Sequence, residues 1–288
     1  MFSKKTKKAE QIIPAEKKGP GLFCIHGFIE NHETSFRHLK EYLQARGITN
    51  YEMPNVHGHG GGERLEDFDY KKAVERIEQQ YTDFKSRNEV VYLLGFSMGG
   101  ALATHLAAKY GADKLVLIAP ALRYGITRNT SKGLVWFFKD LLDAQTDDKV
   151  IQKDFAKIDL GTIVDKILDF GEQNTYEIHE KMSRKFRILN PSTLTNFMRL
   201  INHVRQNLPE RIDVPTRIFV STGDEIVPID SGYYVLDRIS NPDREMITLS
   251  RVSHGILNTQ ARKIVIPQIL DFLYGKEEAK DEQAREAR

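Results

Sequence analysis

Short segments of almost continuous apolar residues alternate along this chain with longer segments of mixed polarity. Apolar segments of about four to eight residues are typical of parallel strands that are covered on both faces. The segments with this character, of which the last two are weaker, are residues 21–26, 89–94, 114–119, 216–221, 246–249 and 50–56. The pattern predicts a mostly parallel sheet of six to seven strands.

The segments between these strands repeat apolar residues every three to four positions, as one face of an amphipathic helix does. Helices expected from this spacing lie around residues 36–43, 74–81, 101–110 and 264–273. Strands that alternate with helices predict an α/β fold, in which right-handed crossovers place helices on both faces of the sheet.

One long segment interrupts the alternation. Residues 125–210 contain no convincing strand and repeat apolar residues at helical spacing. The segment is too long for a simple connection, and it is not the start of a separate C-terminal domain, because a strand-like segment follows it. We therefore predict a helical cap, residues 125–210, inserted into a core made of residues 20–124 and 211–275.

Composition narrows the classes of function. The 288 residues carry 42 Lys and Arg against 40 Asp and Glu, so the net charge of +2 gives no overall field that favours nucleic acid. No run of about 18 apolar residues predicts a membrane span. The single cysteine, Cys24, excludes an internal disulfide and fits a cytoplasmic location. The polar ends, residues 1–19 and 276–288, are expected to be flexible tails, and the first lacks the apolar segment of a signal peptide.

Residues 95–99 read Gly-Phe-Ser-Met-Gly and lie between a predicted strand and a predicted helix. In this context the G-x-S-x-G pattern is typical of a nucleophile on a sharp turn. Gly95 and Gly99 remove Cβ atoms where strand and helix approach closely. The turn places the Ser97 hydroxyl at a helix N-terminus, which favours developing negative charge. Ser97 is therefore the candidate nucleophile.

A serine nucleophile needs a base, and the base needs a carboxylate that orients it. His254 follows the last predicted strand and is the candidate base, whereas His105 lies inside a helix and is expected to pack there. Asp224 comes directly after a predicted strand and is the candidate orienting carboxylate. Glu225 is its rival, although a neighbouring residue on a turn is expected to point elsewhere.

Two segments compete to supply the backbone N–H group that would hold an oxyanion together with that of Met98. Residues 26–28, His-Gly-Phe, end a strongly predicted strand, and residues 59–62 read His-Gly-Gly-Gly, a pattern of some lipases. The donor must follow a strand beside the nucleophile strand, which favours Phe28 and Met98. Residues 57–60 are then expected to form a structural loop, with a contact at the pocket rim as the alternative. Their two histidines lack an obvious third metal ligand, so no metal site is predicted.

These motifs together resemble the α/β-hydrolase superfamily, and the chain is similar to its bacterial carboxylesterases and monoacylglycerol lipases. The segments that carry the resemblance are residues 26–28, 58–60, 95–100, 223–228 and 253–255. The chain order of the candidate serine, aspartate and histidine is also that of α/β-hydrolases. The resemblance covers residues 20–124 and 211–275, and it implies a triad of Ser97, Asp224 and His254.

The resemblance implies a serine hydrolase that cleaves carboxylic esters through an acyl-enzyme on Ser97, with a small-molecule ester as substrate and no cofactor. The alternatives are the same triad acting on thioesters or carbon–carbon bonds or in acyl transfer, and a binding module without catalysis. Ile29 and Glu30 depart from the small residues common in these esterases and are candidate substrate contacts. The aromatic residues of the predicted cap are further candidates: Trp136, Phe137, Phe138 and Phe197.

Overall fold

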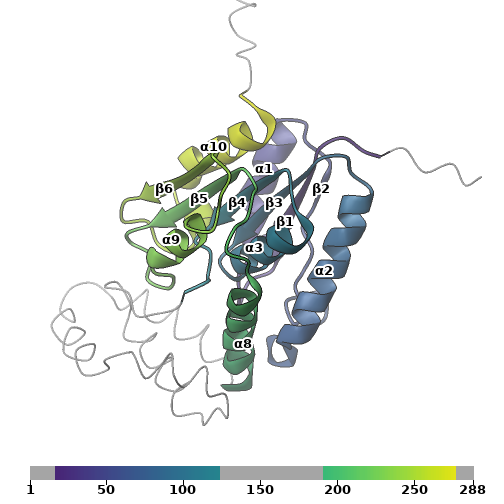
Figure 1. The fold of residues 1–288 in the computed structure, drawn as a ribbon, viewed down its shortest axis with the longest axis vertical. Helices are drawn as coiled ribbons and strands as arrows, with labels where there is room; N and C mark the ends of the chain where they lie inside the picture. Colours follow the sequence, from purple (N-terminus) through teal and green to yellow (C-terminus); the bar gives the residue numbers. More distant parts are fainter. Residues whose placement is uncertain (1–16, 124–190, 277–288) are drawn as a thin grey trace, which may run out of the picture.

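The computed structural model of the chain describes residues 17–123 and 191–276. At its centre lies a six-stranded, fully parallel sheet with the strand order β2-β1-β3-β4-β5-β6 (Figure 1). The strands are β1 (Gly21–Ile25), β2 (Tyr51–Glu52), β3 (Val91–Phe96), β4 (Lys114–Ile118), β5 (Thr216–Ser221) and β6 (Arg244–Leu249). The predicted α/β fold with six to seven mostly parallel strands is therefore confirmed.

The strand that leads to Ser97 lies inside the sheet. β3 pairs with β1 on one side and with β4 on the other, and all its residues are buried. It begins two residues later than the apolar segment suggested, because its ladder with β1 starts at the pair Gly21 and Val91. At the sheet edge, β2 is shorter than predicted, because it pairs with β1 through only Tyr51 and Glu52.

Helices cover both faces of this sheet (Figure 1). On one face lie α1 (His32–Ala45) and α10 (Arg262–Tyr274). The other face carries α2 (Tyr70–Ser86), α3 (Met98–Tyr110), α8 (Pro191–Asn207) and α9 (Asp230–Leu236). Two short 3-10 helices, η1 (Leu65–Asp67) and η2 (Ile256–Asn258), lie in loops.

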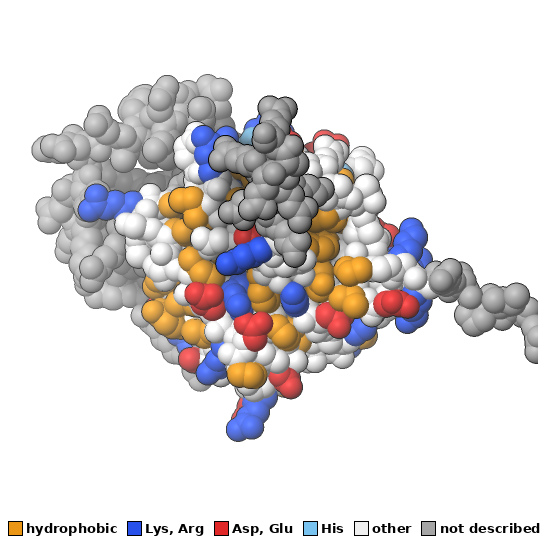
Figure 2. Space-filling model, turned by 90° about the horizontal axis from the view of Figure 1, so that it is seen from above, with side chains coloured by type: hydrophobic (Ala, Val, Ile, Leu, Met, Phe, Trp, Pro, Cys, Tyr) orange, Lys and Arg blue, Asp and Glu red, His pale blue; other side chains and the backbone are white. Residues whose placement is uncertain are grey.

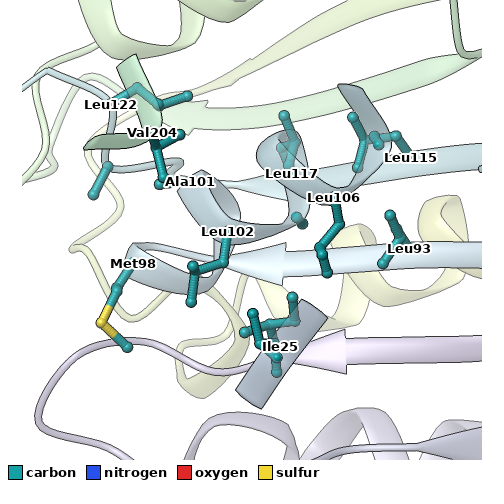
Figure 3. Packing of buried hydrophobic residues seen from close by; sticks show 14 of the residues in the cluster. Ile25, Leu93, Met98, Ala101, Leu102, Leu106, Leu115, Leu117, Leu122 and Val204 are labelled. Carbon is teal, nitrogen blue, oxygen red and sulfur yellow. The ribbon is translucent and has the colours of Figure 1, made fainter. Parts of the chain in front are cut away.

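Successive residues of the central strands point to opposite faces of the sheet and enter two separate apolar clusters. Leu93 packs under α2 and α3, whereas its neighbour Leu94 packs under α1 and α10. Figure 3 shows the first cluster, in which Ile25 and Leu93 of the strands lie close to Leu102 and Leu106 of α3. Burial on both faces is the physical reason why these strands are almost continuously apolar.

The structure describes residues 191–210 of the predicted cap, most of which form the helix α8. Its helical conformation agrees with the apolar spacing of the sequence, and it lies beside α2 and α3. Its residues in the apolar cluster under those helices are Leu200, Ile201 and Val204, and Met198 is also buried. The helix thus packs directly on the α/β core. The predicted cap aromatics Trp136, Phe137 and Phe138, and most of both tails, lie outside the described residues.

Charge is mixed on the surface. On the face shown in Figure 2, basic and acidic side chains are interspersed among apolar ones, and neither sign dominates. This agrees with the small net charge of +2. Among the helices that the structure describes, none has the length and apolar character needed to cross a membrane.

Candidate active site

The turn between β3 and α3 holds Ser97 in a strained backbone conformation. Its φ of 54° and ψ of −117° lie outside the regions that L-residues usually adopt. A Cβ atom on Gly95 would lie 2.2 Å from the carbonyl oxygen of Gly99, and one on Gly99 would lie 2.0 Å from that of Ile25. Only glycine therefore allows strand, turn and helix to approach this closely, which explains the sequence pattern around Ser97.

Ser97 and Asp224, two of the three residues expected to form the triad, both lie within hydrogen-bond distance of the third, His254. His254 Nε2 is 2.9 Å from Ser97 Oγ, and His254 Nδ1 is 2.8 Å from Asp224 Oδ2. The other carboxylate oxygen of Asp224 accepts hydrogen bonds from the backbone N–H groups of Ile226 and Val227, each at 2.8 Å. Both oxygens of this buried carboxylate are thus hydrogen-bonded, and its orientation is determined.

The charges around His254 favour its protonated form. Because a carboxylate only accepts hydrogen bonds, Nδ1 carries the ring proton and Nε2 is left to accept from Ser97. Burial lowers the pKa of His254, but the negative charges of Asp224, Glu225 and Glu30 outweigh it, so the pKa lies above its ordinary value. The site is therefore suited to a histidine that takes up a proton during a reaction.

The rival carboxylate, Glu225, contacts the same histidine at a different point. Its Oε2 accepts a hydrogen bond of 3.1 Å from the backbone N–H of His254, while Asp224 binds the ring. The sequence pattern did not reveal this contact. The only available signal was the position of Glu225 directly after Asp224, which says nothing of the neighbouring loop.

Other histidines have structural partners. His105 is buried in α3, where its Nε2 lies 2.6 Å from Glu78 Oε1, in agreement with a packing role. His26 Nδ1 donates to the Gly27 carbonyl, its Nε2 accepts from the Val56 N–H at 2.9 Å, and burial lowers its pKa to about 3. Within the described residues, no three His, Cys, Asp or Glu side chains are grouped so that they could hold a metal ion.

The loop that leaves β1 passes directly beside the nucleophile. A Cβ atom on Gly27 would lie 3.4 Å from the Cβ of Ser97. Ile29 has a φ of 67°, which is rare for a β-branched residue and reflects a sharp bend after Phe28. Within the described part of the chain, the N–H groups of Phe28 and of Met98, the first residue of α3, donate no hydrogen bond to protein atoms. Both N–H groups are thus available to a ligand.

The competing glycine-rich loop binds mainly to itself. The Gly58 N–H donates to Glu63 Oε2 at 2.7 Å, and Arg76 forms an ion pair of 2.8 Å with the same carboxylate. The hydrogen bond from Arg76 is the main reason why the pKa of Glu63 falls to about 2. His59 Nδ1 donates to the carbonyl of His57 at 2.9 Å. These contacts support the interpretation of residues 57–60 as a structural loop.

The same loop also forms one wall of a pocket of about 200 Å³. Ile29 and Glu30, the candidate substrate contacts, line this pocket together with His59. The carboxylate of Glu30 accepts a hydrogen bond of 2.5 Å from Ser35 Oγ. Residues 57–60 therefore have a structural role and a position at a pocket rim at the same time.

One predicted cap aromatic lies among the described residues and contacts the β1–α1 loop. The ring of Phe197, in α8, stacks on the ring of Phe28 with centroids 4.4 Å apart and planes inclined by 22°. Phe68 and His59 also pack against Phe28, with centroids 5.4 Å away in both cases. The side chain that follows Gly27 is thus held between three rings from separate segments.

Known proteins share this architecture. Residues 20–261 match the family described as "Serine aminopeptidase, S33". A relative from Synechocystis sp. named "Putative non-heme chloroperoxidase" is 30% identical over 270 residues, 88% of this chain and 91% of the relative. The thermostable monoacylglycerol lipase of Bacillus sp. is 24% identical over 261 residues, 90% of this chain and 92% of the lipase.

A solved structure described under "LipS and LipT, two metagenome-derived lipolytic enzymes" has the same fold, with a TM-score of 0.60, 20% identity, and coverage of 88% of this chain and 93% of that one. The resemblance to α/β-hydrolases that the motifs carry is thereby confirmed. Because the family match covers residues 20–261, which include the whole described sheet together with Ser97, Asp224 and His254, this chain belongs to the α/β-hydrolase family described as serine aminopeptidase, S33.

Proposed function

We propose that this protein is a serine hydrolase that cleaves carboxylic esters through an acyl-enzyme on Ser97. The observation that carries the proposal is the continuous series of hydrogen bonds from Asp224 through His254 to Ser97, with separations of 2.8 and 2.9 Å. The Bacillus relative named a monoacylglycerol lipase, whose length this chain matches almost completely, supports an ester as the bond that is cleaved.

In the first half of the reaction, Ser97 Oγ attacks the ester carbonyl carbon while its proton passes to Nε2 of His254. Asp224 keeps the proton of the imidazole on Nδ1 and stabilises the imidazolium that forms. The negative charge that develops on the carbonyl oxygen is stabilised by the N–H groups of Phe28 and Met98, which no protein atom of the described residues accepts. His254 then gives its proton to the leaving alcohol, and Ser97 retains the acyl group.

In the second half, His254 removes a proton from water, which attacks the acyl-enzyme carbonyl through the same oxyanion-stabilised geometry. The acid product leaves, and Ser97 recovers its proton. Each residue thereby returns to its starting state, so the cycle uses only groups of this chain and water.

The surroundings of Ser97 suggest how a substrate is arranged. We assign the acyl chain to the apolar surface that Phe28 and Phe197 form, because apolar and aromatic side chains dominate ligand pockets. We assign the more polar part of the ester to the pocket that Ile29 and Glu30 line, where the Glu30 carboxylate lies. A cytoplasmic location completes the proposal, since Cys24 is a buried free thiol.

The decisive experiment compares wild-type protein with Ser97→Ala in the hydrolysis of p-nitrophenyl esters and in covalent labelling by a fluorophosphonate. We expect Ser97→Ala to abolish both, because no other group of the site can form the acyl-enzyme. Ser240→Ala removes an exposed serine away from the triad and serves as the matched control that keeps both activities. Retention of more than a few per cent of turnover by folded Ser97→Ala would refute the role of Ser97.

A substrate panel then tests the bond type. Oxygen esters, thioesters and vinylogous diketones present the same triad with an ester, a thioester and a carbon–carbon bond. We expect oxygen esters to have the highest kcat/KM. If thioesters or diketones exceed them at least tenfold, the same Ser97 mechanism serves the alternative bond, and the ester assignment is wrong.

A further inference from the structure

Two neighbouring loops of the site are joined by side chains of one that bind the backbone of the other. We call residues 221–227, which begin at the last residue of β5, the acid loop, and residues 249–255, which begin at the last residue of β6, the histidine loop. Ser221 Oγ, at the start of the acid loop, accepts from the Val252 N–H at 2.9 Å and donates to the Val252 carbonyl at 2.5 Å. Thr222 Oγ1 accepts from the Arg251 N–H at 3.1 Å.

The close approach of these loops requires a small residue between their contacts. A Cβ atom on Gly223 would lie 2.6 Å from the carbonyl carbon of Arg251. Arg251 itself has a φ of 55°, an uncommon conformation for this residue type that its bond to Thr222 helps to hold. The histidine loop is therefore shaped by the acid loop at successive peptide groups.

Glu225 makes the last contact of this series, at the histidine itself. Its Oε2 accepts the His254 N–H at 3.1 Å, while Asp224 accepts the ring N–H at 2.8 Å. Asp224 thus controls the ring and Glu225 controls the main chain from which that ring extends. Both contacts are needed to define the position of Nε2, because an imidazole whose ring is oriented still moves when its backbone moves.

We infer that Glu225 is a positioning residue for His254: its carboxylate holds the histidine backbone in place and adds a second negative charge beside the imidazole. This inference rests on the proposed function of the triad. Glu225 touches neither the substrate nor Ser97 in this mechanism, and its effect on the reaction passes through His254. A carboxylate that accepts a backbone N–H makes a stronger bond than a neutral group, which suits the role.

Among the described residues, the charged groups that face His254 come from two elements. Asp224 and Glu225 approach from the acid loop, and Glu30 approaches from the β1–α1 loop. β3 contributes no charge, because its contact is the ring of Phe96, 5.1 Å from that of His254. Each carboxylate raises the pKa of His254 against the effect of burial. Removal of the Glu225 charge must therefore lower this pKa and extend the activity of the base to lower pH.

Two substitutions separate the charge of Glu225 from its hydrogen bond. Glu225→Gln keeps an oxygen that accepts the His254 N–H and loses only the charge, whereas Glu225→Ala loses both. We expect Glu225→Gln to keep kcat at its pH plateau within about threefold and to move the acidic limb of the kcat/KM profile to lower pH. We expect Glu225→Ala to lower the plateau kcat about tenfold to a hundredfold, with KM for the shortest ester changed less.

Glu245→Gln is the matched control. It removes a carboxylate from β6, the strand that leads into the histidine loop, but this carboxylate pairs with Arg217 and is exposed. We expect its pH profile and its kcat to match those of the wild type. An equal loss in the Gln and Ala variants, or an unmoved acidic limb in Glu225→Gln, would overturn the inference.

A measurement without turnover keeps the inference testable even if esters are not the substrate. In the Ser97→Ala background, an NMR titration of the His254 ring gives its pKa directly, with and without Glu225→Gln. We expect the substitution to lower this pKa and Glu245→Gln to leave it unchanged. An unchanged pKa refutes the inference about Glu225, whereas failure of the Ser97→Ala test refutes the proposed function alone.

Discussion

Two segments that begin with His-Gly follow the neighbouring strands β1 and β2, and they have opposite structural outcomes. In residues 26–28, the Phe28 N–H has no protein acceptor among the described residues, and Gly27 lies against Ser97. In residues 57–62, Gly58 and His59 bind groups of their own loop. A glycine-rich motif therefore does not by itself identify a candidate oxyanion donor. What distinguishes the proposed donor is a free N–H group in the loop that lies against the nucleophile.

The second segment nevertheless supports the first. The backbone N–H of Val56, one residue before His57, donates to Nε2 of the neutral His26 at 2.9 Å. The ring of His59 packs on those of His26 and Phe28, with centroids 5.3 and 5.4 Å away. Residues 57–62 thus pack against residues 26–28 and help to hold them in place.

The largest expected effect impairs the histidine base and leaves both His-Gly segments unchanged. Asp224→Asn should lower kcat by about 10⁴, as a triad Asp→Asn change does when it stabilises the wrong imidazole tautomer. Steady-state kinetics on a p-nitrophenyl ester measures this loss. Glu225→Gln is the matched variant and should have a mild effect on kcat. If Glu225→Gln proves to be the more damaging of the two, the orienting role belongs to Glu225.

A pair of glycine substitutions tests the two segments directly. A Cβ on Gly27 would lie 2.9 Å from the Phe96 ring, so Gly27→Val must displace the loop that carries the Phe28 N–H. We expect kcat to fall about 10²-fold, as when one oxyanion donor is lost. Gly61→Ala adds a Cβ to the other segment, where no atom lies within 4 Å.

The positive φ of Gly61, 66°, makes its alanine variant slightly strained, so we expect a loss of about 1 kcal/mol in unfolding free energy but near wild-type kcat. Thermal unfolding and kinetics of both variants separate the two effects. A large loss of kcat in Gly61→Ala, combined with an active Gly27→Val, would show that the oxyanion donor lies in the His-Gly-Gly-Gly segment, residues 59–62.

A smaller effect is expected where α8 contacts Phe28, in the segment of residues 26–28. Phe197→Leu removes the stacked ring from Phe28 and should lower kcat/KM for long-chain esters about three- to tenfold relative to the shortest ester. A chain-length series of p-nitrophenyl esters measures the change. Phe272→Leu, a ring in α10 on the opposite face, should leave the series unaltered. Equal losses at every chain length in Phe197→Leu would exclude a role in acyl selection.

The smallest expected effect is on the free energy of unfolding, and it concerns Glu63, which binds the segment of residues 57–62. The pKa of Glu63 falls from 4.5 to about 2 on folding, so its contribution is present above pH 4.5 and is lost as pH falls through 2. The carboxylate is partly exposed, and we therefore expect Glu63→Gln to cost about 1 kcal/mol or less at pH 7. Urea unfolding at several pH values should show this difference shrinking below pH 4.5. A difference that persists undiminished at pH 2 would exclude ionic stabilisation by Arg76.

Some features of the site could be predicted because their signals are local. Ser97, Asp224 and His254 each follow an apolar segment, and the glycines beside Ser97 report a crowded turn, so their positions are readable from short stretches of chain. The contact of Glu225 with the His254 N–H has no such signal. It requires the acid and histidine loops to leave adjacent parallel strands, and it depends on the register between β5 and β6.

The sequence by itself determined the α/β class, the strands and the residues at their carboxyl ends, because burial on both faces imposes an apolar pattern that any parallel strand must show. Only the tertiary structure decided which of the two His-Gly segments lies against Ser97 and keeps a free N–H group, and that the Phe197 ring rests on Phe28. These outcomes depend on which backbone groups are occupied, as Glu63 occupies the Gly58 N–H, and on which segments the fold brings together. The spacing of residues along the chain does not show these contacts, because they form only when the order of the strands in the sheet brings the segments together.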